Sequence, residues 1–130
     1  MVGRSQKVLP QGMPDSLKKR RLLNEKELSA ETCRDYGEKF LALGLVEDAL
    51  EFFLRGNYGP GLEKIKAQAI EDGDAYLMAR LGPHAPEIWR QVADRALKLR
   101  KIHFARRALE LAGDKDIADE LAASLTDNSS

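Results

Sequence analysis

The chain has few of the side chains that carry most enzyme and metal chemistry. Its 130 residues include one Cys, two His and one Trp, so Cys33 cannot form a disulfide within the chain. A single thiol is compatible with a reducing compartment. No Cys-x-x-Cys pair occurs, and neither His84 nor His103 has a second His or a carboxylate four residues away, as a helical metal pair requires. We therefore expect no metal and no cofactor.

Long apolar runs are also missing. No stretch approaches the roughly 18 apolar residues of a membrane span, and residues 1–11 lack the apolar core of a secretory signal. Val, Ile and Thr are sparse, so a β-sheet would lack its preferred residues. We expect a soluble, cytoplasmic protein that does not attach to a membrane.

The residues that dominate the chain are Ala, Leu, Glu, Lys and Arg, all good helix formers. The formal net charge is zero, which argues against a general nucleic-acid binder because such proteins usually carry a basic excess. That zero conceals blocks of charge, with a net +4 over 1–30, +4 over 83–113 and −4 over 114–130. The blocks could steer assembly with a partner or a second copy, or could be solvated helix faces.

The apolar pattern predicts an all-α fold. Gly and Pro residues without periodicity predict a disordered or extended arm over 1–14, followed by a single α-helical repeat domain over 15–125 and a frayed tail over 126–130. We expect helices at about 15–28, 30–43, 46–55, 61–71, 75–81, 86–99 and 101–112, then a short last helix to about 125. Because the connections are short, neighbouring helices should be antiparallel.

Glycines and caps set the expected ends of these helices. Gly44, Gly73 and Gly113 should end helices, with Gly44 at a C′ position, Asp74 should cap the next helix, and residues 58–61 should form a turn. The expected buried sets are Cys33, Tyr36, Gly37 and Phe40; Val46, Ala49, Leu50, Phe53 and Leu54; Leu62, Ile65, Ala69 and Ile70; Ala75, Met78 and Ala79; Trp89, Val92, Ala93 and Ala96; and Ile102, Ala105, Ala108, Leu109 and Ala112.

Two segments can be superposed at equal offsets. From Cys33 the offsets 3, 4, 7, 16 and 20 reach Tyr36, Gly37, Phe40, Ala49 and Phe53, and from Trp89 they reach Val92, Ala93, Ala96, Ala105 and Leu109. A large residue opens each first helix, and a small residue one turn later lets the second helix approach. This pattern resembles the tetratricopeptide-repeat (TPR) family, and the second segment is also similar to the helical repeats of vesicle-coat subunits. The repeats are short and the middle one is degenerate, since Lys66 stands where a small residue belongs.

The resemblance implies a right-handed α-α superhelix of about three antiparallel helix pairs, with an added N-terminal and a short C-terminal helix. It also implies a non-enzymatic scaffold that binds another protein or peptide along the first helix of each pair. The implied positions are Arg34, Glu38 and Leu41; Glu63, Ala67 and Ile70; and Arg90, Asp94, Leu97 and Lys98. Leu41, Ile70 and Leu97 share one offset and could form an aliphatic ladder for an amphipathic helix or an extended peptide. Alternatively, these three residues pack on the helix 15–28 or on a second copy in a homodimer.

A basic set over 90–107 offers a different partner. Its members could form a solvated structural face, bind an acidic partner, or bind RNA or DNA together with the cluster 18–21, which we expect on the exposed face of the helix 15–28. The members of the set are Arg90, Arg95, Lys98, Arg100, Lys101, Arg106 and Arg107. Few aromatic residues interleave with these cations, which disfavours single-stranded nucleic acid. Arg90 and Lys98 flank Asp94 at spacings of four, as in ion pairs within a helix. Since no nucleophile or phosphate-loop motif appears, we expect no enzymatic activity.

Overall fold

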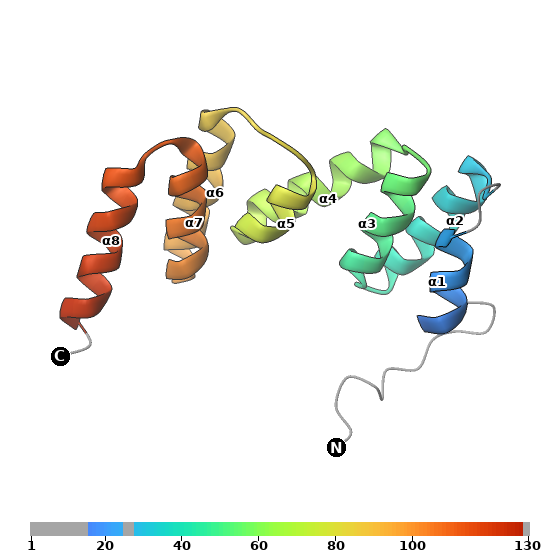
Figure 1. Cartoon of the computed structure of the whole chain (residues 1–130), viewed down its shortest axis with the longest axis horizontal. Coiled ribbons are helices and arrows are strands. Elements are labelled where there is room, and N and C mark those ends of the chain that lie inside the picture. The colour runs from blue at the N-terminus through green and yellow to red at the C-terminus, as the bar shows by residue number, and fades with distance from the viewer. Residues whose placement is uncertain (1–15, 25–27, 129–130) are drawn as a thin grey trace, which may run out of the picture. The chain divides into compact units, whose positions relative to one another are not determined.

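The computed structural model describes residues 16–24 and 28–128, and all regular structure in these ranges is α-helical. Figure 1 labels the helices in chain order. Their bounds are α1 Ser16–Asn24, α2 Ala30–Ala42, α3 Val46–Arg55, α4 Gly59–Asp72, α5 Ala75–Arg80, α6 Pro86–Lys98, α7 Ile102–Ala112 and α8 Lys115–Asn128. Within the same ranges, no helix combines the length and apolar character that crossing a membrane requires. The predicted all-α class is confirmed.

Two compact units make up the chain, one ending at Leu62 and one beginning at Glu63. The first unit holds α1, α2, α3 and the first turn of α4. The second holds the rest of α4 and α5 to α8. The predicted arm over 1–14 lies outside the described residues, and the single repeat domain over 15–125 stays a prediction.

The first unit is built on the α2–α3 pair (Figure 1). An aromatic cluster lies between these two helices. Phe52 stacks on Phe40 with ring centroids 5.6 Å apart, and Tyr36 lies 5.4 Å from the same ring. The neighbouring Phe53 ring is held between two glycines, because a Cβ on Gly37 or on Gly61 would overlap its atoms. The predicted small residue one turn into the first helix therefore does let α3 approach α2.

The second unit is built on the α6–α7 pair, against which α8 and α5 pack. The predicted buried stripe of α6 is confirmed, since Trp89, Val92, Ala93 and Ala96 are all buried. The turn before α5 also touches this pair closely, because a Cβ on Gly73 would lie 2.6 Å from the Cα of Ala96. Helix α5 makes its contacts mainly with α7 and α6 rather than with α4.

One backbone turn recurs at five helix ends. In each, a residue with positive φ donates its N–H to the carbonyl three residues back, and the next N–H bonds to the carbonyl five residues before it. This is the Schellman C-cap. The positive-φ residues are Gly44, Asn57, Gly73, Arg100 and Gly113. Asn57 lies 13 positions after Gly44, and Gly113 lies 13 positions after Arg100. The α2–α3 and α6–α7 pairs therefore repeat one structural unit.

Several helix bounds differ from the prediction. Leu28 is not helical, so the first helix does not run to 28. Helix α4 begins at Gly59 rather than 61, because Pro60 fits the first turn of a helix, where its missing N–H costs nothing. Helix α8 continues to Asn128, past the expected end near 125, since the chain from 126 to 128 holds neither Gly nor Pro to stop it.

Two buried positions were assigned to the wrong residues. Leu54 is 46% exposed, and Phe52 takes its place in the core, because the rings of Tyr36 and Phe40 lie on that side of α3. In α5, Ala79 is exposed and Leu77 is buried. This helix has six residues, too few for periodicity to define a face.

Candidate partner-binding surface

The predicted contact residues of the first unit lie on α2. Arg34 is exposed, and its guanidinium lies 3.4 Å from the Asp35 carboxylate and 3.9 Å from that of Glu31. Glu38 and Leu41 are half-buried. The α2 face therefore presents charges that partner one another, with a leucine only partly accessible.

The predicted residues of the second unit lie on two helices. On α4, Glu63 and Ala67 are exposed and Ile70 is half-buried. On α6, all four predicted residues are exposed and lie opposite the buried stripe; they are Arg90, Asp94, Leu97 and Lys98. Leu97 is 39% exposed, so it is the member of the predicted ladder that offers the most apolar surface. A continuous ladder through Leu41, Ile70 and Leu97 stays a prediction.

The charges on α6 are partnered differently from the prediction. Lys98 does contact Asp94, at 3.4 Å. Arg90, however, forms a two-pronged hydrogen-bonded ion pair with Asp114 before α8, at 2.8 Å from Nε and 3.1 Å from Nη2. Its hydrogen bonds lower the pKa of Asp114 and raise the pKa of Arg90. Arg90 thereby joins α6 to the start of α8.

Four other cations of the 90–107 set also contact carboxylates or backbone carbonyls. Arg95 donates to the backbone carbonyl of Glu71 at 2.7 Å and to its carboxylate at 3.1 Å. Lys101 donates to the carbonyl of Asp72 at 2.8 Å. Arg106 and Arg107 both lie within 3.7 Å of the Glu110 carboxylate. The contacts of Arg95 and Lys101 link the end of α4 to α6 and to the start of α7, whereas those of Arg106 and Arg107 lie within α7.

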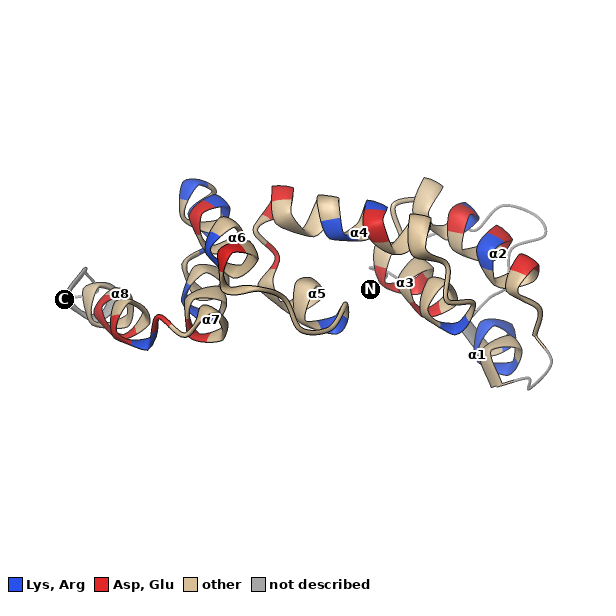
Figure 2. Ribbon diagram, turned by 90° about the horizontal axis from the view of Figure 1, so that it is seen from above, with Lys and Arg blue, Asp and Glu red and all other residues tan. Residues whose placement is uncertain are grey.

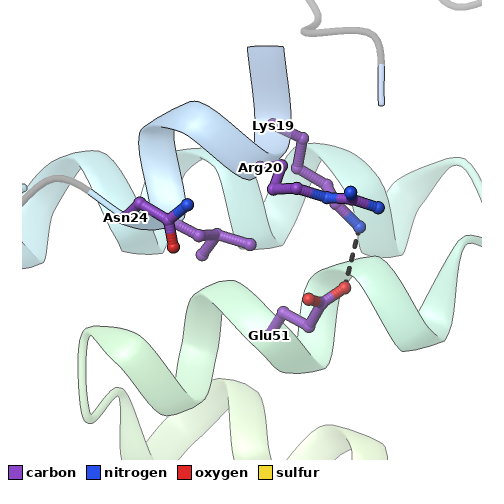
Figure 3. A pocket seen from close by; sticks show the side chains of 5 residues that line it. Lys19, Arg20, Asn24 and Glu51 are labelled. Carbon is purple, nitrogen blue, oxygen red and sulfur yellow. Dashed lines mark hydrogen bonds and ion pairs between the residues drawn. The ribbon is translucent and has the colours of Figure 1, made fainter. Parts of the chain in front are cut away.

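Helix α1 packs on α3 and forms a small cleft with it, shown in Figure 3. Lys19 points into this cleft and bonds Asp48 and, at 2.7 Å, Glu51. Partial burial alone would lower the pKa of Lys19, but the hydrogen bonds to Asp48 and Glu51 outweigh it and raise the pKa. The sequence placed Lys19 on an exposed face with its neighbours, which is wrong, since its side chain is 16% exposed. Acidic residues one turn apart on α3, at 48 and 51, were the available signal.

The cleft itself measures about 330 Å³ and is lined by Lys19, Arg20, Leu23, Asn24 and Glu51. Lys19 in this cleft is already paired with carboxylates of α3, so the cleft marks where α1 packs on α3. This packing also bears on the idea that the N-terminal helix covers the ladder, because the contacts of α1 are mainly with α3 and not with the α2 face that carries Leu41.

Cys33 and His84 are the candidate reactive side chains, and both are held by contacts within the fold. Cys33 is fully buried, as predicted, and burial raises its pKa although the charge of Arg55 opposes the shift. A ring nitrogen of His84 lies 2.8 Å from the carbonyl of Met78, and the ring meets Trp89 edge-on. Among the described residues, no three His, Cys, Asp or Glu side chains come close enough together to hold a metal ion.

Comparison with protein-family models, with curated proteins and with solved structures finds no match for this sequence. The sequence resemblance to helical repeats therefore rests on the residues and on the packed helices described above.

Proposed function

We propose that the chain is a non-enzymatic, TPR-like interaction module of the cytoplasm that binds an amphipathic helix or extended peptide of another protein along α6. The recurring turn and the two similar helix pairs support the repeat character. Repeat proteins built from stacked helix pairs commonly bind partners on the first helix of each pair.

The observation that carries the proposal is the outer face of α6. This helix buries one stripe completely, yet on the other side leaves Leu97 39% exposed beside the charged Arg90 and Asp94. An accessible aliphatic side chain next to fixed charges suits an amphipathic segment, because the leucine supplies apolar contact and the charges select the register. Glu63, Ala67 and Ile70 on α4, and Arg34, Glu38 and Leu41 on α2, are the corresponding positions of the other repeats.

A nucleic-acid partner for the 90–107 face receives less support. Arg90, Arg95 and Lys101 hold Asp114, Glu71 and the Asp72 carbonyl, and Arg106 and Arg107 contact Glu110. A phosphate backbone would have to displace these contacts before it gained the same cations.

The test is a selection of displayed peptides on the immobilised chain, followed by affinity measurement on two variants. Leu97→Asp places a charge where the apolar contact is proposed, and Leu111→Asp is the matched control. Leu111 is also a leucine with similar exposure (37%), but lies at the other end of the antiparallel α6–α7 pair. Circular dichroism melts establish that both variants fold.

We expect the selected peptides to lose about tenfold or more in affinity for Leu97→Asp, since losing one anchor contact costs more than about 1 kcal/mol. Their affinity for Leu111→Asp should not change. Peptides that bind Leu97→Asp as tightly as the wild type would rule out the α6 face. Adding Leu41→Asp tests the first unit in the same way.

A further inference from the structure

The first helix of the chain leaves one of its sides uncovered. In α1, Lys19, Leu22 and Leu23 are at least half-buried toward α3. A second stripe, at spacings of three, four and seven, is exposed throughout, although its Arg20 and Asn24 also line the cleft with α3; it consists of Leu17, Arg20, Arg21 and Asn24. Leu17 is 66% exposed, the highest value for a large apolar side chain in the described residues. This α1 stripe is thus an apolar residue followed one turn later by two cations.

The last helix also has one exposed side, and the charges on that side are negative. Helix α8 packs on α7 through the fully buried Ala118. Its outer stripe is exposed and consists of Asp116, Ile117, Asp119 and Glu120. Ile117 is 52% exposed, and Glu120 follows it by three residues, as Arg20 follows Leu17. Figure 2 shows the basic residues on α1 and the acidic residues on α8.

The charges of the two helices are complementary. Helix α1 carries four basic residues and no acidic one, whereas α8 carries four acidic residues and one basic. The two stripes also match in order, so a side-by-side alignment that sets Leu17 on Ile117 brings Arg20 to Glu120. The chain as a whole has zero net charge, so copies do not repel one another at long range.

We infer that the α1 stripe of one copy docks on the α8 stripe of a second copy. The contact joins two different surfaces, so each copy can engage one neighbour through α1 and another through α8. Such head-to-tail contacts build linear assemblies or closed rings rather than a two-fold dimer. This self-association uses none of the α6 residues proposed to bind a partner, and either proposal can fail without the other.

The first measurement is sedimentation equilibrium of the wild-type chain from micromolar to millimolar concentration. We expect the weight-average mass to rise continuously with concentration to at least twice that of the monomer at low salt. High salt should return it toward the monomer, because exposed charges are screened within about 10 Å at 0.1 M ionic strength and within less at higher salt. A mass that stays at the monomer value up to millimolar concentration at low salt overturns the inference.

A charge exchange identifies the two surfaces. Arg20→Glu/Arg21→Glu makes both exposed stripes acidic, and Asp116→Lys/Glu120→Lys makes both stripes basic, so either variant alone should be monomeric. An equimolar mixture should associate again, since the acidic α1 stripe of one variant meets the basic α8 stripe of the other. The chain that carries all four substitutions should self-associate like the wild type.

The matched control is Lys98→Glu/Arg107→Glu, which changes the net charge by the same amount as Arg20→Glu/Arg21→Glu at exposed positions outside both stripes. Its self-association should be about as strong as that of the wild type, and stronger than that of Arg20→Glu/Arg21→Glu. If the α1 and α8 variants associate normally, or if their mixture stays monomeric, the pairing of these two stripes is wrong.

Discussion

Replacing Gly73 with Ala should destabilise the second unit strongly, for two separable reasons. The first is the backbone, because Gly73 has φ +63 and an L-residue in this region costs about 1–2 kcal/mol. The second is space. The added Cβ would lie 2.6 Å from both the N and Cα of Ala96 and 2.9 Å from its Cβ, and these atoms belong to the last turn of α6 and cannot rotate away.

Overpacking of this kind costs typically about 1–3 kcal/mol. The sum predicts a loss of about 2–5 kcal/mol in the free energy of unfolding. Gly113→Ala is the control, since Gly113 ends α7 with the same turn at φ +90, but a Cβ added to it would meet no atom within 4 Å. It should lose only the backbone part, about 1–2 kcal/mol.

Urea unfolding followed by the fluorescence of Trp89 gives the comparison. This is the only tryptophan of the chain, and it is 4% exposed within α6, so its signal reports the unit that contains both glycines. With slopes of about 1–3 kcal/mol per molar urea, the midpoint of Gly73→Ala should fall roughly 1 M below that of Gly113→Ala. If the two variants unfold within about 0.5 kcal/mol of each other, the close approach of the turn to α6 contributes no stability, and the reasoning fails.

Two further predictions concern the same unit. Arg100 is an exposed non-glycine residue at φ +63, so Arg100→Gly should raise the free energy of unfolding by about 0.5–1 kcal/mol in thermal or urea unfolding. Arg100→Ala keeps the backbone strain and should leave the free energy of unfolding unchanged. A destabilised glycine variant would contradict this. Arg90 lowers the pKa of Asp114 in the folded chain. The pair should therefore stabilise the fold fully at pH values above the ordinary Asp pKa of about 3.9. This contribution should be lost as the pH falls through the lowered pKa of Asp114 in the folded chain. Comparing wild type with Asp114→Asn across this range should show a gap that is constant near neutral pH and closes in acid; a gap that persists at the lowest pH would refute the assignment.

The sequence predicted α6 well because every local signal agrees there. Pro86 sits at the first helical position, and the apolar residues Trp89, Val92, Ala93 and Ala96 fall on one side with polar residues between them. Helix α3 shows where such reasoning ends. Three consecutive residues of α3, Phe52, Phe53 and Leu54, are all apolar, so periodicity alone could not show whether Phe52 or Leu54 is buried. The choice is made by the rings of α2, which are distant in sequence.

Sequence reasoning selected exposed residues of α6 but not their ionic contacts. The resemblance to helical repeats pointed to Arg90, Asp94 and Leu97, and all three are exposed. Spacing within the helix paired Arg90 with Asp94, whereas its partner Asp114 lies 24 residues away. Lys19 was likewise misplaced because its partners belong to α3. Contacts between helices depend on how the pairs pack, and a 3.6-residue period carries no information about that.

The most extensive packing joins helices that follow one another directly, α2 with α3, α6 with α7 and α7 with α8. Loops this short cost little entropy to close, and chains dominated by such local contacts fold in microseconds to milliseconds. The α2–α3 pair can therefore form on the ribosome while the second unit is still being synthesised, at about 5–20 residues per second. The close packing of the Phe53 ring involves only residues between 37 and 61, so it would be complete before α6 emerges from the ribosome.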